Sequence, residues 1–538
     1  MSLKSSRRQF VRNAAAASVT ALLPQGVFSQ GPTPLSVVVR PGVEIGVVKP
    51  ELHSHFAEHL GSCVYGGLWV GKNSRIPNVD GYRKAAVDAL KELGIPVLRW
   101  PGGCFADNYH WRDGIGPVNK RPRRVNMNWA NALEDGSFGL HEFIGLCRLI
   151  GAEPYLSVNV GSGTPQEALD WVEYCNFPKG TTLSDERIAN GDPEPFRVRY
   201  WGIGNETWGC GGRMRPEYYA DVYRQYSNYM RSFGGTQPFL IACGPNQNDA
   251  NWTRGFFSGM AGGRGLNGFA MHYYQNGSLT ATDFTVDAMN QQLSTFQTVE
   301  RAIVYQRTLI DSFSVPPGTG RGGFGGPPPG RGGTQPPVAL ILDEWGVWDR
   351  MKPEEQQNYG QLWQQSTMRS AVAAGLGLNI FNRHADKLYM CNIAQMVNVL
   401  QSLLLTDGPA GENCIKTTTY HAFALFRPHR SKTAVKVDSG ATGPLDLSMS
   451  ASRSGSELVI SFVNPKSDAS LRIDCSLDGR TAKSASAQIL THKDFNAANT
   501  FGNPNAIVPQ KHSIEAAGAS VKLDLPPMSI VTATVQMG

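Results

Sequence analysis

Eight short apolar runs, separated by segments of helical periodicity, occupy residues 50–390 and constrain the fold more than any other feature. The runs are 51–59, 96–103, 154–161, 197–206, 238–246, 268–274, 339–348 and 376–386. Helical patterns lie between them at 80–94, 139–151, 164–175, 215–234 and 353–375. Strands that alternate with amphipathic helices indicate a parallel sheet covered by helices. Eight such units predict a (β/α)8 TIM barrel at residues 50–428.

The regions that flank the barrel have a different pattern. Residues 429–538 contain β-type segments with turn signals and no helical stretches between them. This pattern predicts a C-terminal all-β sandwich, jelly-roll-like, which the β-type segment 31–49 is expected to join. Within the barrel, residues 316–337 are rich in proline and glycine and cannot bury a core, so we expect a disordered surface insertion.

The first thirty residues carry the paired arginines Arg7 and Arg8, followed by an alanine-rich apolar stretch. This pattern indicates a twin-arginine signal and a periplasmic or extracellular protein, although a basic, frayed N-terminus would look similar. Removal of residues 1–30, which have four basic and no acidic side chains, lowers the net charge from +6 to +2. A charge this small gives no reason to expect binding to nucleic acid or to an anionic membrane.

Nine cysteines are scattered along the chain without any CxxC pair. An odd number without paired spacing argues against a disulfide scaffold, so we expect free thiols.

Polar side chains gather where the predicted strands end, which is where a TIM barrel builds its active site. The set comprises His55, Glu58, His59, Arg99, Asn205, Glu206, His272, Tyr274, Asp343, Glu344, Asn382, His384 and Asp386. Glu206 and Glu344 each end an apolar run beside an aromatic residue, and strands four and seven face each other across the barrel. Paired carboxylates are what glycosidic-bond hydrolysis requires, although either one alone could be a buried hydrogen-bond acceptor.

Several blocks together resemble the α-L-arabinofuranosidases of glycoside hydrolase family 51. They are "HFAEHLGSCVYGGLW", "LRWPGGCFADNYHWRDGIGP", "GAEPYLSVNVGSGTPQEALDWVEYCN", "WGIGNETWG", "LDEWGVW" and "CNIAQMVNVLQ", in order between residues 50 and 405, with a weaker echo in "LPPMSIVTATV". The resemblance implies an exo-acting, retaining glycosidase that releases terminal α-L-arabinofuranosyl residues from hemicellulose or pectin fragments. It also points to a homo-oligomer, and neither metal nor cofactor is expected.

Carried over residue by residue, the resemblance makes Glu206 the acid/base and Glu344 the nucleophile, with carboxyl groups about 5–5.5 Å apart. Its sugar-binding set comprises Glu58, Arg99, Cys104, Asn205, His272, Tyr274 and Gln395. The chain departs from the family at Cys104, where asparagine is usual and a thiol is a weak hydrogen-bonding group. It also departs at residues 134–139 and in the proline- and glycine-rich insertion. Trp129 is the candidate for the family's nearby loop aromatic.

Three other functions fit parts of the sequence. The first-strand residues His53, His55, Glu58 and His59, with His272 and Asp386, resemble the metal site of an amidohydrolase, but strand four offers Asn205 and Glu206 instead of a bridging lysine. A non-catalytic carbohydrate-binding barrel would not be expected to keep both glutamates. Another retaining glycosidase, either a β-xylosidase or an endo-β-glucanase, stays open because pocket shape decides between them.

Overall fold

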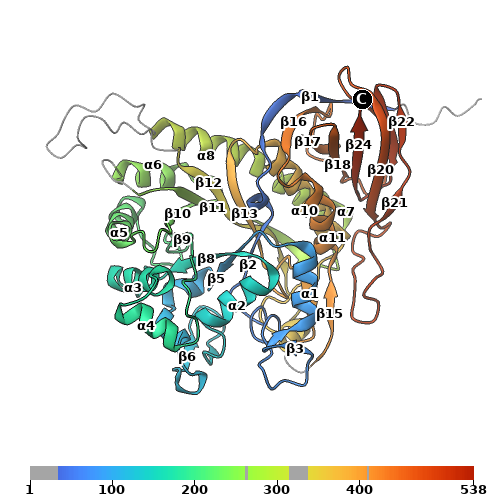
Figure 1. Cartoon of the computed structure of the whole chain (residues 1–538). Coiled ribbons are helices and arrows are strands. Elements are labelled where there is room, and N and C mark those ends of the chain that lie inside the picture. The colour runs from blue at the N-terminus through green and yellow to red at the C-terminus, as the bar shows by residue number, and fades with distance from the viewer. Residues whose placement is uncertain (1–33, 261–264, 314–336, 409–410) are drawn as a thin grey trace, which may run out of the picture. The chain divides into compact units, whose positions relative to one another are not determined.

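Eight parallel strands close into a barrel in the computed structural model, which describes residues 34–260, 265–313, 337–408 and 411–538 (Figure 1). The closed order is β2, β5, β8, β9, β10, β11, β12, β13 and back to β2. Their bounds are Ser54–Phe56, Val97–Trp100, Glu153–Val158, Tyr200–Ile203, Phe239–Asn246, Gly268–Thr280, Ala339–Arg350 and Leu388–Ala394. The predicted TIM barrel is therefore confirmed. The predicted signal at 1–30 and nearly all of the insertion at 316–337 lie outside the described residues.

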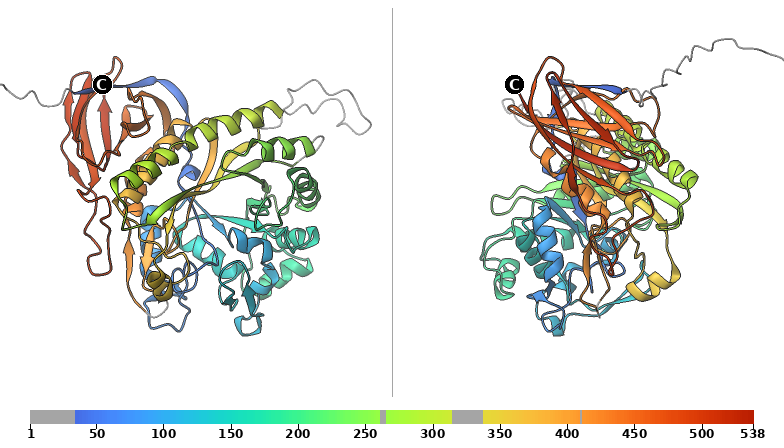
Figure 2. Two further views of the ribbon diagram at one scale, coloured as in Figure 1. Left: turned by 180° about the vertical axis from the view of Figure 1, so that it is seen from behind. Right: turned by 90° about the vertical axis from the view of Figure 1, so that its right-hand side faces the viewer.

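Helices cover the outside of this barrel (Figure 2). In chain order they are α1 Lys84–Leu93, α2 Leu140–Ile150, α3 Pro165–Asn176, α4 Thr182–Ala189, α5 Pro216–Tyr229, α6 Ala250–Gly259, α7 Val286–Phe296, α8 Val299–Phe313, α9 Pro353–Tyr359, α10 Met368–Arg383 and α11 Thr418–Phe426. Helix α1 shows how the sequence specifies them: Ala86, Leu90 and Leu93 recur at helical spacing on the buried face, and Gly94 ends the helix in the left-handed conformation. None of the helices in the described ranges is long and apolar enough to cross a membrane.

The eighth strand is not where the sequence predicted it. Residues 376–386 lie mostly in α10, and the strand is β13 at Leu388–Ala394. Consequently Asn382, His384 and Asp386 lie at the end of a helix rather than at the barrel mouth. Helix α10 is buried along almost its whole length, so apolar residues occur on all of its sides. Such a run shows no amphipathic period and cannot be distinguished from a buried strand by sequence pattern.

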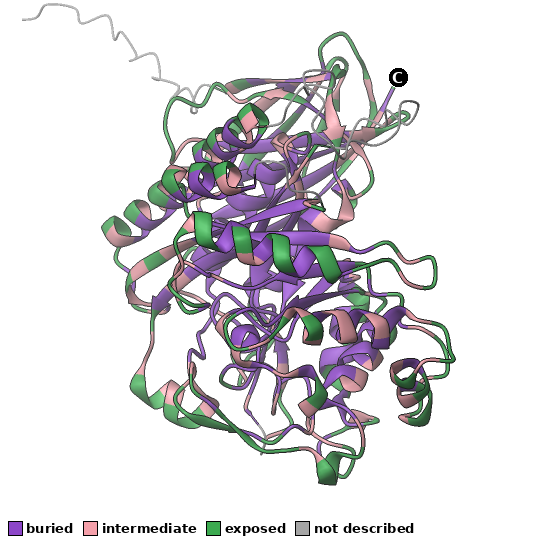
Figure 3. Cartoon of the chain, turned by 90° about the vertical axis from the view of Figure 1, so that its left-hand side faces the viewer, coloured by how far each residue is buried: buried purple, intermediate pink, exposed green. Residues whose placement is uncertain are grey.

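Large side chains fill one end of the barrel interior. Tyr155, Tyr200, Ile241, Ile341 and Met390 form one buried cluster near the middle or start of their strands. Figure 3 shows buried residues running through the strands at the centre of the molecule. Polar residues come later on the same strands, so the packed end supports a polar opposite end.

The C-terminal region supplies nine strands of a ten-stranded sheet, and β1 supplies the tenth, which confirms the predicted β-rich domain. Strand β1, Leu35–Val47, pairs antiparallel with β16 and parallel with β19, and in Figure 1 this blue strand runs beside the red and orange ones. The other bounds are β16 Thr433–Asp438, β17 Ser448–Ser454, β18 Glu457–Asn464, β19 Leu471–Ser476, β20 Ala482–Thr491, β21 Gln510–His512, β22 Glu515–Ala517, β23 Ser520–Leu525 and β24 Ser529–Met537. Asn379 of α10 hydrogen-bonds Ser448 and Ser450 of β17, which ties this sheet to the barrel.

Short elements elsewhere complete the described chain. They are the paired strands β3 Asn78–Val79 and β4 Tyr82–Arg83, β6 Arg124–Asn126 and β7 Ala132–Glu134, and β14 Leu404–Thr406 and β15 Cys414–Lys416, with the 3-10 helices Pro50–His53, Cys104–Asn108, Trp111–Gly114, Val118–Lys120 and Arg427–His429. The 3-10 helix η2, Cys104–Asn108, follows β5 and lies beside the residues described next.

Candidate active site

Glu344 lies within β12, where it is buried and held by two donors. Arg99 of β5 donates from Nη1 to Glu344 Oε1 at 2.6 Å, and the Tyr274 hydroxyl of β11 donates to Oε2 at 2.7 Å. Burial by itself would raise the pKa of Glu344. The charges of His272 and Arg99, with the two hydrogen bonds, outweigh burial and hold its pKa below the ordinary value. The site therefore keeps this carboxylate ionised.

Arg99 connects three parts of the barrel mouth from a fully buried position. Its Nη2 donates to Asn205 Oδ1 at 2.6 Å, and its Nε lies 3.1 Å from Asp343 Oδ2. Its guanidinium group also lies over the Phe56 ring, 4.6 Å from the centroid. The planar guanidinium group has several donors in a fixed geometry, so it holds the Glu344 carboxylate and the Asn205 amide in place together.

Glu206 lies in the loop after β9 and approaches Glu344 from the opposite side of the barrel. Its Oε1 is 2.9 Å from His272 Nδ1, which is itself 3.5 Å from Glu344 Oε2. Oxygens of the two carboxylates come within 4.8 Å of each other. Burial would lower the pKa of His272, but the Glu344 charge and the hydrogen bond to Glu206 raise it overall. Two carboxylates this close, in different surroundings, can divide the roles of acid and nucleophile.

Glu58, directly after β2, forms the third acidic position. Its Oε1 accepts from Phe105 N at 3.0 Å and from Trp129 Nε1 at 2.9 Å, while Gln395 Nε2 donates to Oε2 at 3.1 Å. Burial, with the nearby Glu344 charge, raises the pKa of Glu58 to about 7. Trp129 thus lies at the site, as the sequence comparison suggested.

The expectation of a free Cys104 thiol was wrong. Cys104 forms a disulfide with Cys210, with a Cα–Cα distance of 5.5 Å. A disulfide sulfur carries no proton and cannot donate a hydrogen bond, so Cys104 contributes no thiol contact to a sugar. The other seven cysteines are free, and the general expectation of free thiols fails only at this pair.

The first-strand histidines do not converge on a metal site. His53 accepts from Arg430 Nε, His55 is fully buried, and His59 lies 2.7 Å from Glu134 Oε2. Over the described ranges, two groups have three ligand-type side chains close together: Cys104 with Glu206 and Cys210, and Glu206 with His272 and Glu344. Neither group contains a first-strand histidine, and Asp386 instead pairs with Lys387.

Sequence reasoning missed three contributors to this site. Asp343 anchors Arg99, Trp348 packs edge-on against Tyr274 with ring centroids 5.4 Å apart, and Cys210 closes the disulfide. The sequence places Asp343 at a strand end but does not indicate its contact with Arg99. The sequence places Cys104 and Cys210 after two predicted strands that end at the barrel mouth, but this position alone does not pair them.

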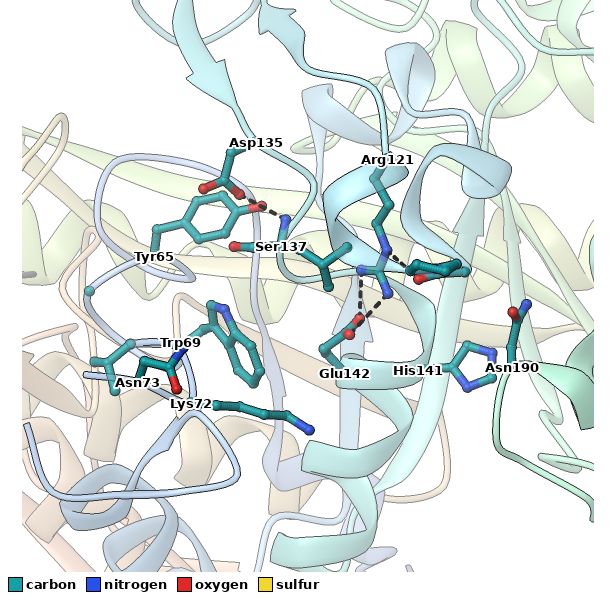
Figure 4. A pocket seen from close by; sticks show the side chains of 16 residues that line it. Tyr65, Trp69, Lys72, Asn73, Arg121, Asp135, Ser137, His141, Glu142 and Asn190 are labelled. Atoms are coloured by element: carbon teal, nitrogen blue, oxygen red, sulfur yellow. Dashed lines mark hydrogen bonds and ion pairs between the residues drawn. The ribbon is translucent and has the colours of Figure 1, made fainter.

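A cavity of about 610 Å³ is lined by a different set of residues (Figure 4). Tyr65, Trp69, Lys72 and His141 contribute to its lining, and Arg121 and Glu142 form a two-pronged ion pair in its wall. None of the nine predicted site residues lines it, so this cavity is not the meeting point of the carboxylates.

Comparisons with known proteins agree on one family. The α-L-arabinofuranosidase 1 domain matches residues 89–297, and the α-L-arabinofuranosidase C-terminal domain matches residues 343–529. An intracellular exo-α-L-arabinofuranosidase of Bacteroides ovatus is 39% identical over 505 residues, which cover 91% of this chain and 93% of that protein.

Solved structures give the same result. The family 51 arabinofuranosidase of Xanthomonas axonopodis pv. citri is 37% identical with a TM-score of 0.85, and the comparison covers 93% of this chain and 99% of that one. The Thermotoga maritima α-L-arabinofuranosidase, solved with arabinose, is 30% identical with a TM-score of 0.78 over 93% and 99% of the two chains.

The Bacteroides relative also corrects the predicted location. That relative is an intracellular enzyme, which contradicts the expectation of export by the twin-arginine route. A paired arginine before an alanine-rich stretch is a short, low-information pattern, and it was insufficient evidence for a signal. The domain matches, the relative and the solved structures together show that the chain belongs to the α-L-arabinofuranosidases of glycoside hydrolase family 51.

Proposed function

We propose that this protein is an exo-acting, retaining α-L-arabinofuranosidase. It would remove terminal α-L-arabinofuranosyl residues from arabinose-containing hemicellulose or pectin fragments. The observation that carries the proposal is the approach of two carboxylates, Glu206 and Glu344, to within 4.8 Å at the barrel mouth. This separation suits double displacement, because an inverting enzyme needs a wider gap for water between its carboxyl groups.

Glu344 is the proposed nucleophile. Arg99 and Tyr274 hold it ionised and aim its oxygens, which is the state needed to attack the anomeric carbon. Attack forms a bond between a Glu344 oxygen and that carbon while the glycosidic bond breaks. The product is a covalent arabinosyl-enzyme with inverted configuration.

Glu206 is the proposed acid/base. It gives its proton to the departing glycosidic oxygen, then takes a proton from water, which attacks the same carbon and releases Glu344. Two inversions leave the configuration retained. His272 contacts Glu206 at 2.9 Å and is a candidate to orient it in both steps.

The remaining predicted residues form the proposed sugar-binding set. Glu58 and Gln395 are bonded to each other and offer oxygen acceptors to furanose hydroxyls, since Gln395 Oε1 is buried without a partner among the described residues. Asn205, held by Arg99, is the candidate for the 2-hydroxyl. Assembly into a homo-oligomer stays a prediction.

Hydrolysis of three substrates tests this function: p-nitrophenyl α-L-arabinofuranoside, p-nitrophenyl β-D-xyloside and soluble cellulose. We expect rapid release only from the arabinofuranoside, and NMR of the first-formed sugar should show the α anomer. Preferential action on the xyloside or the cellulose would favour the two other retaining activities. A β-arabinose first product would contradict double displacement.

A further inference from the structure

The Cys104–Cys210 disulfide joins two loops at the barrel mouth that are 106 residues apart in sequence. Cys104 begins η2, four residues after the end of β5, which carries Arg99, and Cys210 lies in the loop that follows β9. The bond therefore links the loop after strand two to the loop that carries Glu206. Neither sulfur takes part in the proposed double displacement.

The bond lies against the proposed acid/base itself. Cys210 Sγ is 3.7 Å from Glu206 Oε2 and 3.8 Å from Asn205 Nδ2. Glu206 therefore has His272 at one carboxylate oxygen and a sulfur at the other. Any movement of Cys210 alters the wall against which the Glu206 side chain rests.

The backbone at Glu206 depends on such support. Its φ of 41° lies in the left-handed region, which residues other than glycine seldom adopt unless their surroundings impose it. Several hydrogen bonds hold the loop, and three of them lie next to Glu206: Asn205 N donates to Asp107 Oδ2 at 2.9 Å, and the amides of Gly209 and Gly211 donate to Glu206 O. Asp107 belongs to η2, as Cys104 does, so the disulfide adds a covalent link between two loops that the Asn205–Asp107 hydrogen bond already joins.

Solvent reaches this disulfide more easily than the other sulfurs. Cys210 is exposed and Cys104 is half-buried, whereas six of the seven free cysteines are buried and Cys414 is half-buried. Burial raises the pKa of all seven free thiols, which keeps them protonated and unreactive. A thiol reductant cleaves disulfides and leaves free thiols unchanged, so it would act only at Cys104–Cys210 in the described chain, which contains all nine cysteines.

We propose that the Cys104–Cys210 disulfide is a redox-sensitive positioning element for Glu206, whose reduction slows the steps that need proton transfer by Glu206. A dithiol reductant breaks the Sγ–Sγ bond, and each sulfur takes up one proton while the reductant closes its own disulfide. After reduction the two loops remain joined by the hydrogen bond between Asn205 and Asp107. The protein therefore stays folded, but the position of the Glu206 side chain is less fixed. This inference rests on the proposed role of Glu206 as acid/base.

The test compares two leaving groups in the oxidised and reduced protein. An alkyl α-L-arabinofuranoside needs a proton on its departing oxygen, whereas 2,4-dinitrophenolate leaves without one. We expect reduction to lower kcat/KM roughly tenfold on the alkyl substrate, below the 10²–10⁴-fold of complete loss, and less than about twofold on the dinitrophenyl substrate. Reoxidation should restore the rate, and a thiol count should rise by two on reduction.

Variants separate this positioning role from general loosening. The Cys104→Ser/Cys210→Ser protein should behave like the reduced enzyme and ignore the reductant. Cys414→Ser, which removes a half-buried thiol outside the site, should respond to reductant as the parent does. If the double variant folds poorly, the reduced parent, checked by circular dichroism, gives the same comparison.

Three results would overturn the inference: nine free thiols in protein isolated without reductant, equal losses on the two substrates, or no loss on either. Glu206→Gln distinguishes a failure of the underlying function. If this variant keeps the parent's rate on the alkyl substrate, Glu206 is not the acid/base. If it loses that rate while the reduced enzyme does not, only the disulfide proposal fails.

Discussion

Glu344 lies inside β12, a twelve-residue strand paired on both sides with β11 and β13, whereas Glu206 lies three residues beyond the end of β9 in a loop. The Glu344 side chain is 7% exposed and the Glu206 side chain 19%. One carboxylate is thus fixed by strand register and strong donors, and the other by a histidine, a disulfide and an unusual backbone. The proposed nucleophile needs one constant charge state, while an acid/base must exchange its proton in every cycle.

Substitution of each glutamate should have the largest effects on activity, and the two substitutions should differ in their dependence on the leaving group. Glu344→Gln has no nucleophile, so we expect kcat/KM to fall on the order of 10⁴-fold or more on alkyl and dinitrophenyl arabinofuranosides alike. Glu206→Gln should lose about 10²–10⁴-fold on the alkyl substrate and little on the dinitrophenyl one. Steady-state kinetics on the two substrates measure the difference. The reverse pattern would exchange the two roles.

Arg99→Met should strongly destabilise the surroundings of Glu344. It leaves Glu344 and Asp343 buried without their cation, and breaking a buried pair in this way costs about 3–5 kcal/mol of unfolding free energy. Denaturant unfolding measures the loss. Arg472→Met is the control, because its pair with Asp524 is exposed and should contribute about 1 kcal/mol or less. Equal losses in the two variants would contradict a special role for Arg99.

Tyr274→Phe also acts on Glu344, and its expected effect on activity is smaller. The lost hydrogen bond favoured the ionised form of Glu344, so the pKa of Glu344 rises and the acid limb of kcat/KM moves to higher pH. We expect about a tenfold lower kcat/KM, the value of one hydrogen bond to a charged group. Tyr273→Phe, whose hydroxyl bonds Thr298, is the control. An unmoved acid limb would show that Tyr274 does not tune Glu344.

Glu58→Gln tests whether burial alone explains these charge states. Glu58 is as buried as Glu344, yet its pKa rises to about 7 from an ordinary value near 4.5. The folded state therefore binds this proton more tightly than the unfolded state, and its stability falls as pH rises from 4.5 to 7. The glutamine variant lacks this cost. It should gain about 1–3 kcal/mol relative to the parent between pH 5 and pH 8.

Thermal unfolding at the two pH values measures the change in relative stability. Gln395 can turn its unpartnered Oε1 toward the new amide, so the substitution leaves no donors facing each other. A relative stability that is the same at pH 5 and pH 8 would contradict the raised pKa of Glu58.

Sequence patterns predicted the barrel and the convergence of Glu206, Glu344, Arg99 and Tyr274. The strand-end rule works because parallel strands deliver their last residues to one edge whatever the intervening loops are. The rule failed at residues 376–386, because a helix buried on all sides carries the same apolar run as a buried strand. Cys104 was predicted as a sugar contact because it occupies the position of the family's usual asparagine, and its local sequence does not reveal a bond to a residue 106 positions later.

The sequence by itself determined the alternation of apolar strands with helices, the β-rich C-terminal region and the chemistry available at each strand end. These follow from periodicity and residue type, which are local properties. The tertiary structure alone decided that Cys104 bonds Cys210, that Glu206 adopts a left-handed backbone, and that two equally buried acids, Glu58 and Glu344, have opposite pKa shifts. Those outcomes depend on which residues, distant in sequence, come within a few ångströms of each other in the fold. Electrostatic interactions and disulfide formation depend on that spatial distance and not on separation along the chain.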